Sequence, residues 1–280
     1  MPGMSARLRE IAKRTEEIVA KGRYEAPGGR PVTIGPQVAS ALAGTVMYGP
    51  EAVPVTPDTD RSTRFEVTGE SSLEAARRLS GAAPAPVAVL TFASARNPGG
   101  GYLNGAQAQE EALCRASALY ATLVRVPGFY AHHRAERSPF YTDRVIHSPA
   151  VPVFRDDRAR LLDSPYTVGF LTSPAPNAGV IRARTPGEAG RIPAALASRA
   201  ERVLETAAAC GYRRLVLGAW GCGVFRNDPR QVAAAFRAPL TGEGRFAGHF
   251  DEVVFAVLDR TPGATTLGAF RDAFAAVTTV

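Results

Sequence analysis

Short apolar runs alternate with amphipathic segments along most of this chain, which predicts strands alternating with helices. Apolar and β-branched residues predict strands or extended segments at 31–34, 53–55, 64–67, 87–92, 145–149, 151–154, 167–172, 215–219 and 253–258. Apolar residues at helical spacing predict helices at 5–21, 38–42, 71–81, 107–124, 192–209 and 267–274. Such alternation favours an α/β fold, a largely parallel sheet with helices on both faces. With no repeat or linker in sight, we expect one domain over residues 1–280.

The stretch around 87–120 has the order strand, glycine loop, helix. The three glycines at 99–101 carry no Cβ, so the loop backbone can approach a ligand closely. Free loop amides and a helix N-terminus can bind a phosphate or a polar sugar. Two simpler interpretations remain open: a flexible hairpin loop, and a Glu110-Glu111 pair favoured only by the helix dipole.

A second glycine loop, Gly221-Cys222-Gly223, follows the strand at 215–219 and precedes Asp228, a predicted N-cap before Pro229. A cysteine between glycines can imitate a nucleophile elbow, but no histidine is placed to act as its base. The loop therefore predicts a backbone cradle for a diphosphate. Because ligands collect at the carboxyl ends of parallel strands, we expect both glycine loops to share one site.

Two adjacent histidines, His132 and His133, lie in a stretch from Pro127 to Phe140 that looks irregular. Neither an HExxH motif nor a Cys/His pair at ligand spacing accompanies them. We therefore interpret them as solvated loop histidines and expect no metal site. The prolines within 145–154 predict an interrupted strand near a sheet edge.

The composition narrows the function only slightly. The formal net charge is +7, and the arginines are scattered without a basic tract, so a phosphate-bearing substrate and nucleic acid are both compatible with it. Three cysteines without CxxC spacing favour reduced thiols in a cytoplasm. No segment approaches the ~20 apolar residues of a membrane span, and the N-terminus lacks a secretory h-region.

The motif from Asn97 to Gly101, NPGGG, followed by Gln109-Glu110-Glu111, resembles the GGG-x(6–8)-QEE signature of poly(ADP-ribose) glycohydrolases. The surrounding LTFASARNPGGG and EEALCRASALY resemble the bacterial-type branch of that family. The resemblance extends from about residue 5 to 276. It implies a macrodomain-like fold with an N-terminal helical extension, here about residues 1–60, packed on the catalytic domain.

The resemblance also implies the chemistry, which is hydrolysis of the ribose–ribose O-glycosidic bonds of poly(ADP-ribose) to release ADP-ribose. Glu111 would be the general acid and then the general base, and Glu110 would hold a ribose. A general acid must begin protonated, so its surroundings would have to raise the pKa of Glu111. The implied substrate-binding residues are Asn97, Gly99, Gly100, Gly101, Gln109, Gly221, Cys222, Gly223, Val224 and Phe225. Among them, Asn97 would bind ribose hydroxyls, and the residues from Gly221 to Val224 would bind the diphosphate. Phe225 would position the distal ribose. The resemblance implies no metal and no cofactor.

Three alternatives stay open. The chain could be a non-catalytic macrodomain reader of ADP-ribose, a hydrolase of protein-linked mono-ADP-ribose, or a nucleic-acid-binding protein. The intact QEE motif disfavours the reader, and the missing basic tract disfavours direct nucleic-acid binding. We therefore expect a monomeric cytoplasmic enzyme of a bacterial DNA damage response. Its partners would be poly(ADP-ribose) or ADP-ribose and ADP-ribosylated proteins, without a membrane.

Overall fold

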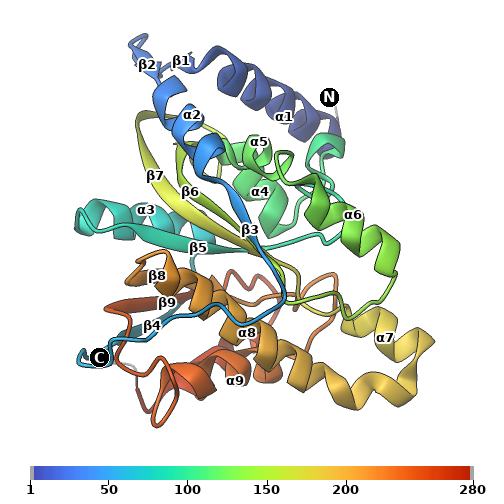
Figure 1. Ribbon diagram of the computed structural model, residues 1–280. Helices are drawn as coiled ribbons and strands as arrows, with labels where there is room; N and C mark the ends of the chain where they lie inside the picture. Colours follow the sequence, from blue (N-terminus) through green and yellow to red (C-terminus); the bar gives the residue numbers. More distant parts are fainter. Residues whose placement is uncertain (1–2, 278–280) are drawn as a thin grey trace.

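The computed structural model describes residues 3–277, and within them a mixed seven-stranded sheet has the order β3-β6-β7-β5-β8-β9-β4 (Figure 1). Its strands are β3 (Val46–Tyr48), β4 (Arg64–Thr68), β5 (Val87–Phe92), β6 (Val145–Arg155), β7 (Leu161–Ser173), β8 (Arg214–Gly218) and β9 (Glu252–Ala256). β7, β5, β8, β9 and β4 pair in parallel, whereas β3 and β6 add antiparallel. The predicted largely parallel sheet is confirmed. A separate hairpin pairs β1 (Arg23–Glu25) with β2 (Pro31–Thr33).

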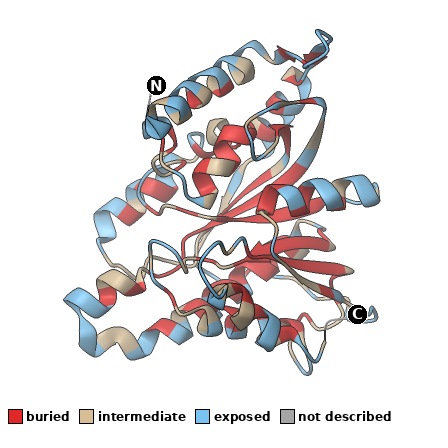
Figure 2. Cartoon of the chain, turned by 180° about the vertical axis from the view of Figure 1, so that it is seen from behind, coloured by how far each residue is buried: buried red, intermediate tan, exposed pale blue. Residues whose placement is uncertain are grey.

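Helices cover both faces of the sheet, and two hydrophobic cores lie beneath them. The helices are α1 (Met4–Lys21), α2 (Gly35–Gly44), α3 (Ser72–Ala82), α4 (Gln109–Ala116), α5 (Leu119–Leu123), α6 (Pro127–Glu136), α7 (Ala178–Arg184), α8 (Ile192–Ala209), α9 (Pro229–Leu240) and α10 (Thr265–Phe274), with 3₁₀ turns η1 (Tyr102–Asn104) and η2 (Pro186–Arg191). In β5, Val87 and Val89 enter one core, and Ala88 and Leu90 the other. Side chains alternate between the faces of a strand, so a strand covered on both sides is apolar throughout. Figure 2 shows this as a buried sheet beneath helices with exposed outer faces.

Local capping explains two of the confirmed helix starts. In α3, the Ser71 amide donates to Glu74 Oε2 at 2.9 Å, and the Glu74 amide donates to Ser71 Oγ at 3.1 Å, which is a capping box. In α9, Asp228 Oδ1 accepts the amide of Arg230 at 2.9 Å, and Pro229 takes the first helical position. Both helices therefore begin where the sequence predicts.

The predicted continuous helix over 107–124 is wrong, because the chain breaks at Ser117 between α4 and α5. Ser117 is extended, with a φ of -146°, and its hydroxyl donates to the Leu113 carbonyl at 2.7 Å. The same Oγ accepts the Leu119 amide at 3.2 Å. A serine side chain that bonds to nearby backbone groups competes with the helix ladder, and here it ends one helix and starts the next.

The extended segments also differ in part from the prediction. Residues 53–55 form no strand, and the Val53 amide instead donates to Glu205 Oε2 at 2.9 Å. β6 continues through both of its prolines, with a register shift between Ser148 and Val151. It lies one strand in from the edge, which the three-residue β3 occupies.

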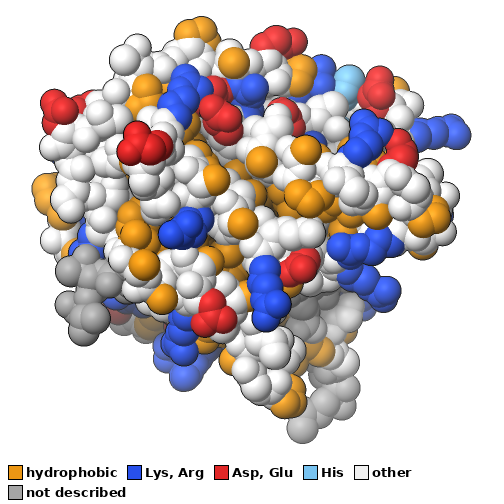
Figure 3. All heavy atoms as spheres, turned by 90° about the horizontal axis from the view of Figure 1, so that it is seen from below, with side chains coloured by type: hydrophobic (Ala, Val, Ile, Leu, Met, Phe, Trp, Pro, Cys, Tyr) orange, Lys and Arg blue, Asp and Glu red, His pale blue; other side chains and the backbone are white. Residues whose placement is uncertain are grey.

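On the face shown in Figure 3, lysine and arginine side chains are scattered among acidic and hydrophobic ones. They form no continuous basic tract on that face, in agreement with the sequence. Across residues 3–277, no helix combines the length and the apolarity needed to cross a membrane.

Candidate active site

The carboxyl ends of three neighbouring parallel strands, β7, β5 and β8, converge on one backbone carbonyl. The carbonyl of Ser173, the last residue of β7, accepts the amide of Ala93 at 3.2 Å and the indole N–H of Trp220 at 2.9 Å. Ala93 begins the loop after β5, and Trp220 belongs to the loop after β8. The two glycine loops therefore follow the carboxyl ends of the adjacent strands β5 and β8 and lie on the same side of the sheet, as predicted.

The three glycines of the first loop are required by the protein's own packing. Gly99 and Gly100 have φ values of 65° and 58°, in the left-handed region that other residues rarely adopt. A Cβ on Gly99 would lie 2.9 Å from Tyr120 Cδ2, and one on Gly100 would lie 2.5 Å from Glu111 Oε1. A Cβ on Gly101 would lie 2.7 Å from the Cβ of Ala106. Glycine thus lets this loop lie directly on the start of α4.

Both glutamates of the QEE motif are buried, and each is fixed through one oxygen only. Glu110 is 2% exposed, and its Oε2 accepts the Ser94 amide at 2.6 Å. Glu111 is 7% exposed, and its Oε1 accepts the Gly101 amide at 2.9 Å. Glu110 Oε1 and Glu111 Oε2 are buried and have no hydrogen-bond partner among residues 3–277. Buried carboxylate oxygens are usually paired, so these two mark a place for a polar ligand.

Burial raises the pKa of the Glu110 carboxyl well above its usual value. The amides of Ser94 and Gly99 oppose this rise, whereas the charge of Glu111 adds to it. A carboxyl with a raised pKa keeps its proton to higher pH and can then donate a hydrogen bond. Glu110 is therefore suited to bind a hydroxyl or another acceptor of a ligand.

Gln109 anchors the start of α4 to the sheet. Its side-chain Oε1 accepts the amide of Phe92 at 2.9 Å, and its Nε2 donates to the Leu90 carbonyl at 2.8 Å. The same Nε2 donates to Ser72 Oγ at 3.1 Å. Because both N–H groups have protein acceptors, the carboxamide holds the glutamates that follow it against β5.

The second loop is closed by Asn227, which is 3% exposed. Its side-chain Nδ2 donates to the carbonyls of Pro176 at 2.8 Å and Gly221 at 3.2 Å. Its backbone amide also donates to the Gly221 carbonyl, at 3.1 Å. Gly221 has a φ of 69°, and a Cβ there would lie 2.6 Å from both Asn227 Nδ2 and the Cβ of Ala175. Asn227 was not predicted as a site residue from the sequence, where its polar side chain after a glycine turn was the available signal.

The outer residues of this second loop are free of such packing. A Cβ on Gly223 would meet nothing within 4 Å, and Val224 is 81% exposed. Phe225 is half-buried, and its ring lies 5.9 Å from that of Tyr141, centroid to centroid. Burial raises the pKa of the Cys222 thiol to about 12, so the thiol is protonated at neutral pH, in line with a cysteine that is not a nucleophile.

Asn97, at the start of the first glycine loop, has an exposed side chain, unlike the buried glutamates and the half-buried Gln109. Its backbone closes the glycine turn: its amide donates to Ser94 Oγ at 3.2 Å, and its carbonyl accepts the Gly100 amide at 3.0 Å. Its side-chain amide has no hydrogen-bond partner among residues 3–277 and is accessible to a ligand.

Helix α1 supports the first loop through Tyr102, which the sequence analysis also missed. Tyr102 is fully buried, and its hydroxyl lies 2.8 Å from Glu16 Oε1 and 3.1 Å from the Ala12 carbonyl. Thr15 Oγ1 of the same helix donates to the Arg115 carbonyl of α4 at 2.9 Å. The N-terminal helix thus holds both the glycine loop and the helix that carries the glutamates.

A buried arginine, Arg199 of α8, organises the loop after β7. It is 2% exposed, and it donates to Asp143 Oδ1 at 3.0 Å and to the carbonyls of Pro174 at 2.6 Å and Phe140 at 2.8 Å. The planar guanidinium, with its several donors, suits such a junction. The helical pattern of 192–209 places Arg199 on a buried face, which was the signal for a structural role.

The interpretation of His132 and His133 as solvated loop histidines is wrong. Both lie on α6, which begins with a favourable proline at Pro127. His133 is 1% exposed, and its ring nitrogens lie 2.9 Å from the Phe129 carbonyl and 2.8 Å from Thr142 Oγ1. Burial lowers the pKa of His133 to about 4, so the ring is a neutral structural group. Residues 3–277 contain no group of three or more His, Cys, Asp or Glu side chains arranged to hold a metal.

The comparisons with known proteins agree with this geometry. The family model described as the catalytic domain of microbial-type PARG matches residues 12–156. Poly(ADP-ribose) glycohydrolase from Thermomonospora curvata, solved with the inhibitor ADP-HPD, is 55% identical; the match covers 96% of this chain and 100% of that one, with a TM-score of 0.89. The enzyme from Deinococcus radiodurans, solved with ADP-ribose, is 46% identical over 88% of this chain and 99% of that one, with a TM-score of 0.81. A search of the curated proteins found no match. The chain belongs to the microbial-type poly(ADP-ribose) glycohydrolase family.

Proposed function

We propose that this protein is a glycoside hydrolase that cleaves the ribose–ribose bonds of poly(ADP-ribose) and releases ADP-ribose. One observation carries the proposal: two buried glutamates, Glu110 and Glu111, each have one oxygen fixed by a loop amide and one without a partner. The loops around them follow adjacent parallel strands, where ligands of open α/β sheets bind. Family membership and ADP-ribose bound to the Deinococcus radiodurans relative support the same substrate.

The cleaved bond is an acetal, so the leaving oxygen needs a proton while the ribose gains oxocarbenium character. In the proposed mechanism Glu111 gives that proton from Oε2, the oxygen without a protein partner, and the ribosyl group then reacts with water. Glu111 removes the proton of the attacking water and returns to its starting state. The Gly101 amide holds its other oxygen during both steps.

Glu110 has a different proposed task, because adjacent residues on a helix point about 100° apart and do not form a facing dyad. The raised pKa of Glu110 favours a protonated carboxyl that donates to a ribose oxygen through Oε1. Gln109 would position both glutamates through its bonds to β5. Asn97, exposed beside the loop, would bind ribose hydroxyls.

The second loop would bind the diphosphate. Asn227 fixes Gly221, and the exposed residues Gly223 and Val224 would bind the diphosphate through their backbone. Cys222, whose amide already donates to the Ala219 carbonyl at 3.1 Å, would lie against it. Phe225 would lie against the distal ribose, with Tyr141 behind its ring. Holding the sugar between this aromatic ring and the glutamates orients the acetal for proton transfer.

Product analysis tests the proposal directly. The protein is incubated with poly(ADP-ribose) and, separately, with a protein that carries single ADP-ribose groups, and the products are separated by chromatography. We expect ADP-ribose from the polymer. Release from the mono-modified protein alone would favour the mono-ADP-ribose hydrolase, and tight binding without any product would favour a reader. The monomeric state, the cytoplasmic location and the role in a bacterial DNA damage response stay predictions.

A further inference from the structure

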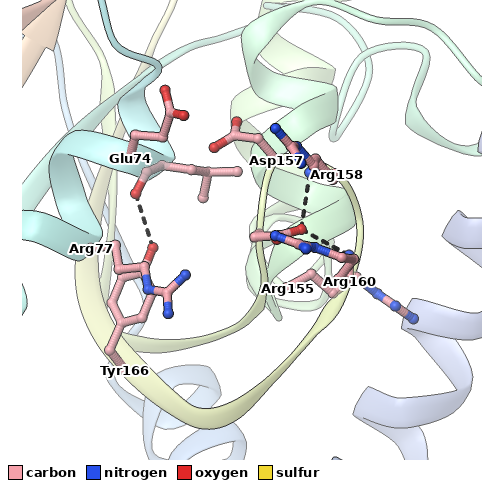
Figure 4. A pocket seen from close by; sticks show the side chains of 9 residues that line it. Glu74, Arg77, Arg155, Asp157, Arg158, Arg160 and Tyr166 are labelled. Atoms are coloured by element: carbon pink, nitrogen blue, oxygen red, sulfur yellow. Dashed lines mark hydrogen bonds and ion pairs between the residues drawn. The ribbon is translucent and has the colours of Figure 1, made fainter. Parts of the chain in front are cut away.

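A cavity of about 280 Å³ lies between α3 and the turn that joins β6 to β7. It is lined by Leu73, Glu74, Arg77, Arg155, Asp156, Asp157, Arg158, Arg160 and Tyr166. Figure 4 shows Glu74 and Arg77 approaching it from α3, opposite the side chains of the turn. The two glycine loops contribute no residue to this cavity, so it is separate from the candidate active site.

Arg155 is the most unusual residue in this cavity, because it is a buried cation without a carboxylate partner among residues 3–277. It is 7% exposed, and its Nε donates to Thr15 Oγ1 at 3.2 Å and its Nη1 to the Ala159 carbonyl at 3.0 Å. Both acceptors are neutral, and burial lowers the pKa of the guanidinium. A buried charge without a counter-ion is costly, so an anion that occupied the cavity would relieve an existing cost.

Two further arginines in the cavity also lack an ion pair within residues 3–277, namely Arg77 and Arg158. Arg160, by contrast, pairs with Asp156 at 2.7 Å, and Asp156 also accepts the amides of Arg158 and Arg160. The carboxylate of Glu74 accepts the Ser71 amide in the capping box of α3. Arg160 and Asp156 therefore neutralise each other, whereas Arg77, Arg155 and Arg158 have no carboxylate partner among residues 3–277.

We propose that this cavity binds a nucleoside phosphate, with Arg77, Arg155 and Arg158 on its phosphate groups. Planar guanidinium groups match phosphate oxygens in pairs, which makes arginine the preferred residue for this contact. The ring of Tyr166, held by its hydroxyl 3.2 Å from the Leu73 carbonyl, and the Leu73 side chain supply an apolar wall for a base. The carboxylates of Asp157 and Glu74 lie beside the arginines and can accept hydrogen bonds from the hydroxyls of a ribose. A nucleoside phosphate therefore suits this cavity better than a bare anion, which carries no such hydroxyls. The volume lies near the lower end of the range for small-ligand sites, about 300 Å³.

The experiment measures ADP binding by calorimetry in a Gly223→Val protein, in which binding at the proposed diphosphate loop is weakened. We expect this protein to bind ADP, and to bind inorganic phosphate more weakly. In the same background, Arg77→Ala with Arg158→Ala should weaken ADP binding at least about tenfold, because two charged hydrogen-bond donors to the phosphate groups are removed. Both residues are exposed, so their loss should leave the fold intact.

The matched control is Arg237→Ala with Arg271→Ala, which removes two exposed arginines from α9 and α10. It should leave ADP affinity unchanged. Absence of ADP binding in the Gly223→Val protein, or equal losses in both double variants, would overturn the proposal. Inorganic phosphate that binds as tightly as ADP would overturn the assignment of a nucleoside. If the glycohydrolase activity proposed above were absent, the difference between the two double variants would still decide this site.

Discussion

The two glycine loops contain the same residue type for opposite physical reasons. In the loop of 99–101, an added Cβ would lie within 3 Å of a side chain at every position, and one of those side chains is Glu111. In the second loop only Gly221 is confined in this way, whereas Gly223 faces open space. Glycine in the first loop therefore allows the loop backbone to pack closely against other side chains of the protein. Gly223 instead leaves open space for a ligand.

This difference divides the site into a rigid part and an open part. The first loop is fixed to α4 through the amides of Gly101 and Ser94 and to α1 through Tyr102, so it sets the position of the glutamates before any ligand arrives. Beyond its closure by Asn227, the second loop presents an uncrowded backbone. Substitutions in the first loop should thus change turnover and stability together, whereas those at the open position Gly223 should change ligand affinity alone.

The largest effect is expected for Glu111→Gln, which keeps the size of the side chain but cannot give or take the proton. Turnover of poly(ADP-ribose) should fall at least about 10²-fold, with little change in ADP-ribose affinity. Glu110→Gln should lower binding and turnover together, because its task is to hold ribose. Steady-state kinetics and ADP-ribose titration separate the two, with melting curves to verify folding. Full activity of Glu111→Gln would refute the mechanism.

Glu110 also makes the rigid part sensitive to pH. Its pKa is raised in the folded protein, so the folded state binds more protons than the unfolded state above about pH 4.3. The contribution of Glu110 to the free energy of unfolding is therefore complete below that pH. It is lost as the pH rises through the pKa of Glu110 in the folded protein, by up to about 1.4 kcal/mol per pH unit. Urea unfolding from pH 4 to 8 should show that the stability of Glu110→Gln relative to wild type increases with pH. Parallel curves for the two proteins would contradict the raised pKa.

Gly100→Ala tests the close approach of the first loop. The new Cβ would lie 2.5 Å from Glu111 Oε1, and the φ of 58° costs a residue with a side chain about 1–2 kcal/mol. We expect a lower melting temperature and a loss of turnover of about tenfold, since displacement of a catalytic group by a fraction of an ångström is enough. Gly223→Ala is the control and should leave the melting temperature unchanged. A Gly100→Ala protein with wild-type stability and turnover would show that the loop can relax.

Gly223→Val tests the open part. A Cβ at this position would meet no protein atom within 4 Å, and the φ of Gly223 is not in the left-handed region, so the free protein should keep its melting temperature. ADP-ribose affinity should fall about tenfold, because a branched side chain in the ligand's space would remove a hydrogen bond to the charged diphosphate. Calorimetric titration with ADP-ribose measures this. Unchanged affinity would place the diphosphate elsewhere.

The sequence predicted most of the sheet and both loops, because these depend on local patterns. The apolar run of β5, the glycines and the cap at Asp228 each show in a few consecutive residues. Contacts between residues far apart in the chain could not be read in this way. Tyr102 meets Glu16 across 86 positions, and Arg199 meets Pro174 across 25, and neither contact has a local signature.

The mispredicted elements have the same cause. Ser117 ends α4 because its hydroxyl finds two backbone partners, a choice that helix periodicity does not reveal. The two histidines looked polar and therefore exposed, yet His133 is buried because a carbonyl and a hydroxyl satisfy its ring. The pKa of a carboxyl such as Glu110 depends on burial, which only the assembled fold determines.

The smallest effect is expected for Phe225→Ala, at the boundary between the two parts. Phe225 is half-buried against Tyr141, and its carbonyl accepts the Gly179 amide at 2.9 Å, so the backbone should hold its place when the ring is removed. Loss of the ring frees the distal ribose to tilt, which lowers the fraction of bound substrate aligned with Glu111. Turnover should fall several-fold, and ADP-ribose affinity should fall less, because the charged diphosphate contacts remain. Val224→Ala is the neighbouring control, and its 81% exposed side chain should contribute little to either quantity. Single-turnover kinetics with saturating polymer isolates the chemical step. If Phe225→Ala lowered affinity as much as turnover, the ring would bind the ligand rather than orient it; if it changed neither, Phe225 would belong to the rigid packing alone.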